Sequence, residues 1–221
     1  MSQLAFLVPV LNRPQHVGPL LRSIYETTPT AHVVFVADPD DAPEISEIEV
    51  HQGCLEAVHG DLTISLLIHA GGYAEKINHA VSETTEPYVF LGADDLRPLN
   101  GWFGAAKDRI DNGFGCVGIN DLLPRRRVHT THFLLSREYA EQPTADGGRG
   151  PLCETYTHNF VDDELIATAQ NRGQYHYENL AKVHHLHPQG MSAPDDATYQ
   201  KGRKSYHADR ATFAVRAALW T

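Results

Sequence analysis

Tyr88-Val89-Phe90-Leu91-Gly92-Ala93-Asp94-Asp95-Leu96 is an apolar run that ends in two adjacent carboxylates. Tyr, Val, Phe and Leu favour a buried strand, whereas a bare carboxylate is costly to bury unless it is paired or bound to a metal. Asp94-Asp95 therefore indicates the end of a strand that faces a cleft, the place where open α/β sheets bind ligands. Oxygen donors there suit Mg²⁺ or Mn²⁺, which typically sit on substrate phosphates. The alternative is a turn in which an Asp caps a helix before Pro98.

Strand and helix patterns alternate along the first half of the chain. Apolar runs at 4–10, 32–37 and 62–68 predict three more strands, with helices from Asn12-Arg13-Pro14 to 24, over 43–58 and over 73–84. Asn12 is predicted as the cap of the first helix, with Pro14 in its first turn. The strands are continuously apolar, which is typical of parallel strands buried on both faces. The pattern predicts a Rossmann-like α/β fold with a mostly parallel central sheet and helices on both faces.

The pattern is looser after Asp95. Residues 98–112 and 161–172 predict helices, and 114–119, 131–136 and 181–186 predict strands. Residues 143–159 show no clear period and predict a long irregular loop, a kind of segment that often forms a lid or a binding loop. A polar helix is expected from 195 onward. No GxGxxG and no P-loop follows the first strand, so the dinucleotide fingerprint is missing.

Composition narrows the classes of function. The chain has 221 residues and a formal net charge of −10, which disfavours general binding to nucleic acid or to an anionic membrane surface. Its cysteines, Cys54, Cys116 and Cys153, form no CxxC pair, and a reducing compartment is the simplest interpretation. The N-terminal apolar stretch is too short for a signal peptide, and no apolar run approaches the roughly 18 residues of a membrane span. These features predict a cytoplasmic protein without a membrane span.

Several motifs, taken in order, resemble those of family 2 glycosyltransferases. Val8-Pro9-Val10-Leu11-Asn12-Arg13-Pro14 is similar to the first strand and turn of that family. At familiar spacing come Asp38 after the second strand, Lys76-Ile77-Asn78-His79-Ala80 after the third, and Phe90-Leu91-Gly92-Ala93-Asp94-Asp95, which resembles the DXD-type motif.

The second half continues the resemblance, which covers roughly residues 4–190. Phe160-Val161-Asp162-Asp163-Glu164-Leu165, with Gly173, is similar to the acidic helix start of the family, and His185-Leu186-His187 lies where such enzymes often place a metal-binding histidine. The chain departs from the family in having Ala-Asp-Asp rather than Asp-X-Asp, and Asp-Asp where Glu-Asp is usual. It also lacks the membrane helices and the Gln-X-X-Arg-Trp motif of processive synthases, so a transferase that adds a single sugar fits better.

The resemblance implies a GT-A fold and a hexosyltransferase-like activity. Residues 1–190 would form the transferase domain, in which about 1–96 bind the nucleotide sugar and about 97–190 bind the acceptor, with 191–221 as a C-terminal helical extension. The donor would be a nucleoside diphosphate sugar, most often a UDP-sugar. Asp38 or Asp40 would accept a hydrogen bond from the base, Lys76 would pair with the diphosphate, and Asp94 would touch the ribose. The other donor-binding candidates are Pro9, Asn12, Arg13 and Asn78.

The metal and the general base are implied in the same way. Asp95 would hold Mn²⁺ or Mg²⁺ together with His187 or, as the alternative, His185. Asp162 matches the base of the family by its spacing to Glu164-Leu165, with Asp163 as the alternative, because an inverting transfer needs a base that deprotonates the acceptor hydroxyl. The acceptor itself is not identified.

Trp102 and the run of three arginines can each be interpreted in two ways. Trp102 would stack on a sugar or belong to the core, and Arg125-Arg126-Arg127 would steer an acidic group or form a solvated loop. Three other functions compete with the transferase. They are a nucleotidyltransferase, a nucleotide-sugar-binding protein without catalysis, and a zinc hydrolase that uses the His184–His187 cluster with Asp162.

Overall fold

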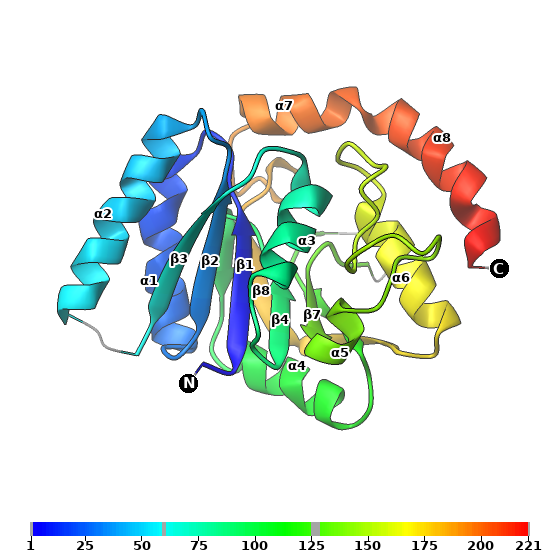
Figure 1. Ribbon diagram of the computed structural model, residues 1–221, viewed down its shortest axis with the longest axis horizontal. Helices are drawn as coiled ribbons and strands as arrows, with labels where there is room; N and C mark the ends of the chain where they lie inside the picture. The colour runs from blue at the N-terminus through cyan, green and yellow to red at the C-terminus, as the bar shows by residue number, and fades with distance from the viewer. Residues whose placement is uncertain (1, 59–60, 125–128, 221) are drawn as a thin grey trace.

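The computed structural model describes residues 2–58, 61–124 and 129–220, with the side chains of 55–58 left out of the description. The three arginines at 125–127 therefore lie outside the described residues. Within the described part, eight strands form one sheet in the order β3-β2-β1-β4-β7-β6-β8-β5 (Figure 1). The strands are β1 Leu4–Pro9, β2 His32–Ala37, β3 Thr63–Ile68, β4 Tyr88–Leu91, β5 Leu96–Pro98, β6 Cys116–Asn120, β7 Phe133–Ser136 and β8 Tyr175–His185.

The helices connect these strands and then run on past β8. They are α1 Val17–Thr27, α2 Ala42–Val58, α3 Tyr73–Ser82, α4 Trp102–Asp111, α5 Arg137–Ala140, α6 Val161–Asn171, α7 Ala197–Lys204 and α8 Tyr206–Arg216, with short 3₁₀ turns η1 Pro14–His16, η2 Pro188–Gly190 and η3 Ala217–Leu219.

The parallel half of the sheet confirms the prediction from strand hydrophobicity. β3, β2, β1 and β4 pair in parallel, and β1 and β2 are buried along nearly their whole length. Beyond β4 the sheet becomes mixed, because β7 runs antiparallel to both β4 and β6, while β6 and β8 are parallel. The result is the predicted α/β fold with a mostly parallel central sheet.

Two apolar layers cover the two faces of the sheet. One layer includes residues of α1, α2 and α4, and the other includes residues of α3, α5 and α6. Trp102 belongs to the first layer: it is fully buried, packs edge-on against Phe6 and Phe90, and donates from Nε1 to Thr28 Oγ1 at 3.0 Å. The structure therefore assigns Trp102 to the core and not to a sugar platform.

Three local expectations are corrected. Asn12 does not cap a helix: its backbone is left-handed, with φ of 53°, and its N–H donates to Asp41 Oδ2 at 2.7 Å. The three-residue strand β5 escaped prediction because it is short and contains Arg97 and Pro98. The polar C-terminal helix is two helices, α7 and α8, which meet at Ser205.

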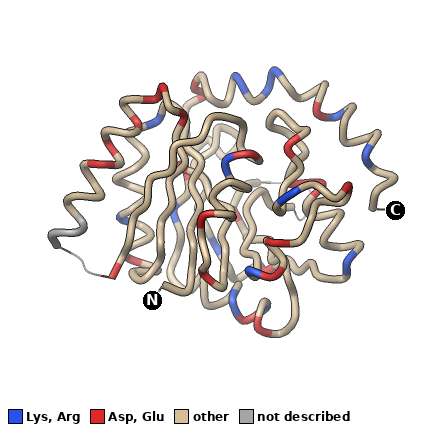
Figure 2. The backbone as a smooth tube through the Cα atoms, in the orientation of Figure 1, with Lys and Arg blue, Asp and Glu red and all other residues tan. Residues whose placement is uncertain are grey.

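α7 lies over the carboxyl ends of the strands, and α8 runs past α6 (Figure 1). They carry five basic residues, Lys201, Arg203, Lys204, Arg210 and Arg216, against the single acidic residue Asp209 (Figure 2). A chain that is acidic overall thus has a locally basic segment. Among the described helices, none is both long enough and apolar enough to cross a membrane.

Candidate active site

A cleft of about 1500 Å³ opens at the carboxyl ends of the parallel strands. Single small-molecule sites usually measure about 300–1,000 Å³, so this cleft has room for two ligands. All but one of the site residues predicted from the sequence line it: Pro9, Asn12, Arg13, Asp38, Asp40, Lys76, Asp94, Asp95, Asp162, Asp163, His185 and His187.

Asn78 is the predicted residue that the structure does not bring to the cleft lining. Its side-chain amide donates to the carbonyls of Arg149 at 3.2 Å and Leu152 at 2.8 Å, and its oxygen accepts from the N–H of Leu152. Asn78 therefore holds the irregular loop before α6 in place, and its hydrogen-bonding capacity is used there.

The turn after β4 delivers the two motif carboxylates to the cleft. Gly92 follows the strand, and a Cβ at this position would lie 2.8 Å from the carbonyl oxygen of Leu7. The close approach of the two backbones thus requires glycine here. The chain then places Asp94 and Asp95 at 5% and 4% exposure, so both carboxylates are almost completely removed from water.

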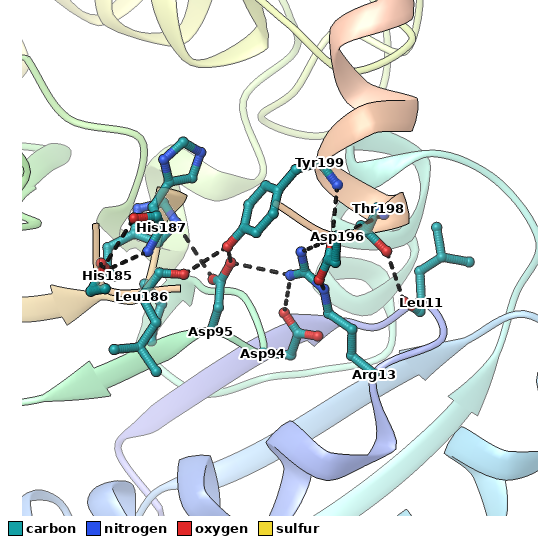
Figure 3. A network of polar contacts seen from close by, with 12 residues as sticks. Leu11, Arg13, Asp94, Asp95, His185, Leu186, His187, Asp196, Thr198 and Tyr199 are labelled. Atoms are coloured by element: carbon teal, nitrogen blue, oxygen red, sulfur yellow. Dashed lines mark hydrogen bonds and ion pairs between the residues drawn. The ribbon is translucent and has the colours of Figure 1, made fainter. Parts of the chain in front are cut away.

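The two oxygens of Asp95 have different surroundings (Figure 3). Oδ2 accepts from the hydroxyl of Tyr199 at 2.7 Å and from Arg13 Nη1 at 3.2 Å. Oδ1 is buried without a hydrogen-bond partner among the described residues, and lies 3.5 Å from His185 Nε2. One oxygen is therefore held by two hydrogen bonds, while the other lies beside a histidine nitrogen without a hydrogen bond among the described residues.

The two adjacent carboxyl groups, Asp94 and Asp95, differ in how readily they ionise. Burial, and then the neighbouring Asp95 carboxylate, raise the pKa of Asp94 above its usual range, although Arg13 Nη1 lies 3.3 Å from Asp94 Oδ1. Burial acts in the same direction on Asp95, but His185 and the hydroxyl of Tyr199 lower the pKa of Asp95 below its usual range. The negative charge is thus concentrated on Asp95, as a metal ligand requires.

Asp95 and His185 fit a divalent ion. Two neighbouring ligands of one ion, with bonds of about 2.1 Å, lie about 3.0–3.5 Å apart, and Asp95 Oδ1 and His185 Nε2 are separated by 3.5 Å. His185 Nδ1 is also buried without a hydrogen-bond partner in the described part of the chain. The ring of His187 lies 5.1 Å from that of His185, so His187 is a neighbour of this pair.

A second group of ligating side chains lies where the general base was predicted. His129 Nε2 is 3.1 Å from Asp162 Oδ2, and His129 Nδ1 is 4.0 Å from Asp163 Oδ1. Among the described residues, these three form the group whose ligand atoms all lie within 4.8 Å of one another. Asp162 and Asp163 open α6, and Phe160 before them has a left-handed backbone with φ of 66°. A strained residue beside a candidate base is typical of functional sites.

Tyr73 is a further residue of the cleft lining. Its hydroxyl is buried without a hydrogen-bond partner among the described residues. Burial raises the pKa of Tyr73, and the carboxylates of Asp162 and Asp95 raise it further. The hydroxyl therefore stays protonated and is a hydrogen-bond donor that no described residue uses.

The donor-binding candidates of the first strands are tied to one another. Lys76 Nζ donates to Asp38 Oδ2 at 2.7 Å and to the carbonyl of Val10 at 2.9 Å. The N–H of Arg13 donates to Glu44 Oε2 at 2.7 Å. The predicted base-binding and phosphate-binding side chains, Asp38 and Lys76, therefore form a pair, and an acidic residue of α2 holds the first turn.

Sequence reasoning missed five residues of the cleft: Tyr73, His129, His132, Tyr199 and the adjoining Asp196. His132 Nδ1 lies 3.1 Å from the carbonyl of Leu91, and its Nε2 is buried without a partner among the described residues. Asp196 carried a local signal as a helix N-cap, and it accepts from the N–H groups of Thr198 and Tyr199. Its contact with Arg13 has no local signal in the sequence.

The arrangement of sheet and helices is the GT-A fold of glycosyltransferases. No protein-family model matches the sequence, and a search of curated proteins finds no match. The similarity is to solved structures. A mannosyltransferase from Pyrobaculum calidifontis, in complex with GDP-Man and Mn²⁺, superposes with a TM-score of 0.70 at 17% identity, over 97% of this chain and 64% of that one.

Two other solved structures share the fold. TarS of S. aureus gives a TM-score of 0.59 at 16% identity, over 81% of this chain and 35% of that one. Glucosyl-3-phosphoglycerate synthase from Mycobacterium tuberculosis, with Mn²⁺, UDP and phosphoglyceric acid, gives 0.57 at 12% identity, over 83% and 70%. The chain thus spans less than two thirds of the mannosyltransferase and about a third of TarS.

Proposed function

We propose that the protein transfers a single sugar from a nucleoside diphosphate sugar to an acceptor hydroxyl, and that it needs a divalent metal. The donor that we expect is a UDP-sugar. The observation that carries the proposal is the charged Asp95 at the end of β4, whose buried Oδ1 faces His185 Nε2 at 3.5 Å. Two of the solved structures with this fold, the mannosyltransferase with GDP-Man and the synthase with UDP, also contain Mn²⁺, which supports the same class of donor here.

The donor would lie along the carboxyl ends of β1, β2 and β4. Asp38 and Asp40 line this part of the cleft next to Pro9, Asn12 and Arg13, and one of the two, Asp38 or Asp40, would accept a hydrogen bond from the base. Mn²⁺ or Mg²⁺, held by Asp95 and His185 with His187 beside them, would neutralise the leaving diphosphate. Lys76 would orient Asp38, because its ammonium contacts that carboxylate at 2.7 Å, and the predicted contact of Lys76 with the phosphates is kept as the alternative.

Asp162 is the proposed general base, with Asp163 as the alternative. The acceptor oxygen would form its bond to the anomeric carbon as the bond to the diphosphate breaks on the opposite face, and the hydroxyl proton would pass to the carboxylate. His129, at 3.1 Å, orients Asp162 and leaves its other oxygen for the acceptor. A base of this kind, next to the acceptor hydroxyl, is what an inverting transfer requires.

The competing functions are less well supported. The zinc hydrolase would use the His184–His187 cluster with Asp162. His185 and His187 line the cleft with Asp162, but His184 is exposed and stands opposite Arg97 in the β5–β8 pair, so the cluster does not act as one set. The nucleotidyltransferase lacks the Gly-rich basic turn after the first strand, where this chain has Pro9 to Pro14. The binding protein without catalysis predicts that function survives Asp162→Asn. We keep the donor half at about 1–96, the acceptor half at about 97–190 and a cytoplasmic location as predictions.

Thermal unfolding with Mn²⁺ and a panel of nucleoside diphosphates and their sugars tests the function first. A ligand at about 100 times its dissociation constant adds about 2.7 kcal/mol, which is a readable shift. We expect a shift that needs both metal and one nucleotide, that is lost in Asp95→Asn and that is kept in the surface control Asp195→Asn. A shift in unfolding temperature with Zn²⁺ alone, and none with any nucleotide, would contradict the proposed function.

A further inference from the structure

We propose that α7 belongs to the donor site, with Tyr199 as the residue that positions the metal-binding carboxylate Asp95 and Asp196 as the residue that positions Arg13. The inference rests on the proposed function and deepens it. It assigns a role to a segment that the sequence placed outside the transferase domain, and Figure 3 shows the contacts that carry it.

Tyr199 bonds to one carboxylate oxygen of Asp95 and leaves the other oxygen available to a metal ion. Its hydroxyl lies 2.7 Å from Asp95 Oδ2 and 2.7 Å from the carbonyl of Leu186, just after β8. The hydroxyl thus links the strand that carries His185 to the motif that carries Asp95. Hydrogen bonds of this kind to a ligating carboxylate fix its orientation, and they strengthen metal binding.

Asp196 acts on the same group through Arg13. Its carboxylate accepts from Arg13 Nε at 2.9 Å and from Arg13 Nη2 at 3.0 Å, a two-bond geometry that fixes the plane of the guanidinium. Arg13 Cζ also lies 4.3 Å from the centre of the Tyr199 ring. The remaining nitrogen, Nη1, is thereby directed at both motif carboxylates, at 3.3 Å from Asp94 and 3.2 Å from Asp95.

The other end of α7 reaches the loop that leads to the proposed base. A Cβ on Gly202 would lie 2.6 Å from His158 Nε2, and Asn159 Nδ2 donates to the carbonyl of Gly202 at 2.9 Å. One short helix therefore contacts the metal end of the cleft at Tyr199 and the base end at Gly202. This placement ties the geometry of Asp95 to the position of α7.

Two matched pairs of variants test the proposal in the full chain. Tyr199→Phe removes one hydroxyl, and Tyr25→Phe on the outer side of α1 controls for that loss. Asp196→Asn keeps a good helix N-cap and loses the charged fork to Arg13, while Asp195→Asn alters the neighbouring carboxylate, which pairs with the exposed Arg203. The readouts are Mn²⁺ affinity by titration of free Mn²⁺ in an electron paramagnetic resonance experiment, and KM and kcat for the donor.

We expect Tyr199→Phe to weaken Mn²⁺ binding by about 10–100-fold, and Asp196→Asn to raise the donor KM about tenfold, with both controls within twofold of the wild type. Unchanged Mn²⁺ binding in Tyr199→Phe overturns the positioning role, and tighter binding overturns it as well, because the hydroxyl would then compete with the ion. A wild type that binds neither Mn²⁺ nor a nucleotide overturns the proposed function itself. The two failures are therefore distinguishable.

Discussion

Two regions of the cleft differ in burial and in how their side chains are held. The proposed metal end, called the metal end below, comprises Arg13, Asp94, Asp95, His185 and Tyr199. The proposed base end, called the base end, comprises His129, Phe160, Asp162 and Asp163. Asp95 is 4% exposed and its Oδ2 is bonded twice, whereas the side chains of Asp162 and Asp163 are 18% and 27% exposed. A buried, fixed carboxylate suits a metal that stays in place, and a more accessible one suits a hydroxyl that arrives with each acceptor.

The two ends also depend on different parts of the chain. The metal end is formed by the turns after β1 and β4, which are adjacent strands of the sheet, by the end of β8 and by Tyr199 of α7. The base end is supported by α8: Phe160 stacks on Phe213, and Arg216 forms a two-bond pair with Glu164 of α6. The comparison therefore predicts that changes at the metal end alter ligand binding, and that changes under the base end alter stability and turnover.

The largest expected effect is at Asp162, the proposed general base. Asp162→Asn should lower kcat by about 10²–10⁴-fold, because general-base catalysis contributes about that much, while the Mn²⁺-dependent binding of the donor stays unchanged. Asp163→Asn, which lies farther from His129, should lower kcat less. Single-turnover transfer and calorimetric donor binding measure the two quantities. Equal losses in donor affinity and kcat would mean that the two ends are not separate.

The second prediction concerns the support of the base end by α8. Arg216→Met should lower the free energy of unfolding by about 3 kcal/mol, because it leaves Glu164, which is 3% exposed, without its cationic partner. Arg210→Met on the same helix is the control, since Arg210 is exposed. Urea unfolding measures both variants. If the two variants are equally stable, α8 is a surface attachment and the contrast between the ends loses its structural basis.

The third prediction adds a pH dependence to the same support. Asp209 accepts from the N–H groups of Thr157, His158 and Asn159 at 2.8–3.0 Å. Burial by itself would raise the pKa of Asp209, but these hydrogen bonds lower it below its usual range. Its stabilisation is therefore present above the unfolded pKa of about 3.9 and is lost as pH falls through the lower folded value.

Asp209→Asn should accordingly cost about 2 kcal/mol at pH 7, and the difference from the wild type should shrink below about pH 4. Urea unfolding of both proteins at several pH values provides the comparison. Asp108→Asn, an exposed carboxylate on α4, controls for the loss of one charge. A difference that stays constant down to pH 3 would show that packing, and not the charge of Asp209, holds the loop before α6.

The sequence predicted the parallel half of the sheet better than the second half for a physical reason. Each strand of the parallel half is buried by its own continuous hydrophobicity, so β1, β2 and β4 and the polar residues at their ends were identifiable locally. β8 was predicted too short, because its polar residues His176, Glu178 and Lys182 break the apolar pattern.

What the sequence could not supply were contacts between distant segments. Tyr199 reaches Asp95 across 104 residues and Asp196 reaches Arg13 across 183, and nothing near Tyr199 in the sequence indicates a site. His129 follows the basic loop, whose arginines lie outside the described residues, and its pairing with Asp162 depends on how two loops fold together. A single sequence reveals such pairs through topology, and the order of β7, β6 and β8 was not predicted.

The smallest expected effect sharpens the comparison within the donor site. The ammonium of Lys76 is 3% exposed and contacts Asp38 and the carbonyl of Val10, so its first action is to orient Asp38 toward the base. Lys76→Met should then weaken the binding of the nucleoside and the binding of its diphosphate by the same factor, about tenfold. Isothermal titration with both ligands measures this, and Lys107→Met on α4, where a half-exposed lysine pairs with Asp111, is the control. A loss confined to the diphosphate would instead favour the phosphate contact that the family resemblance implies.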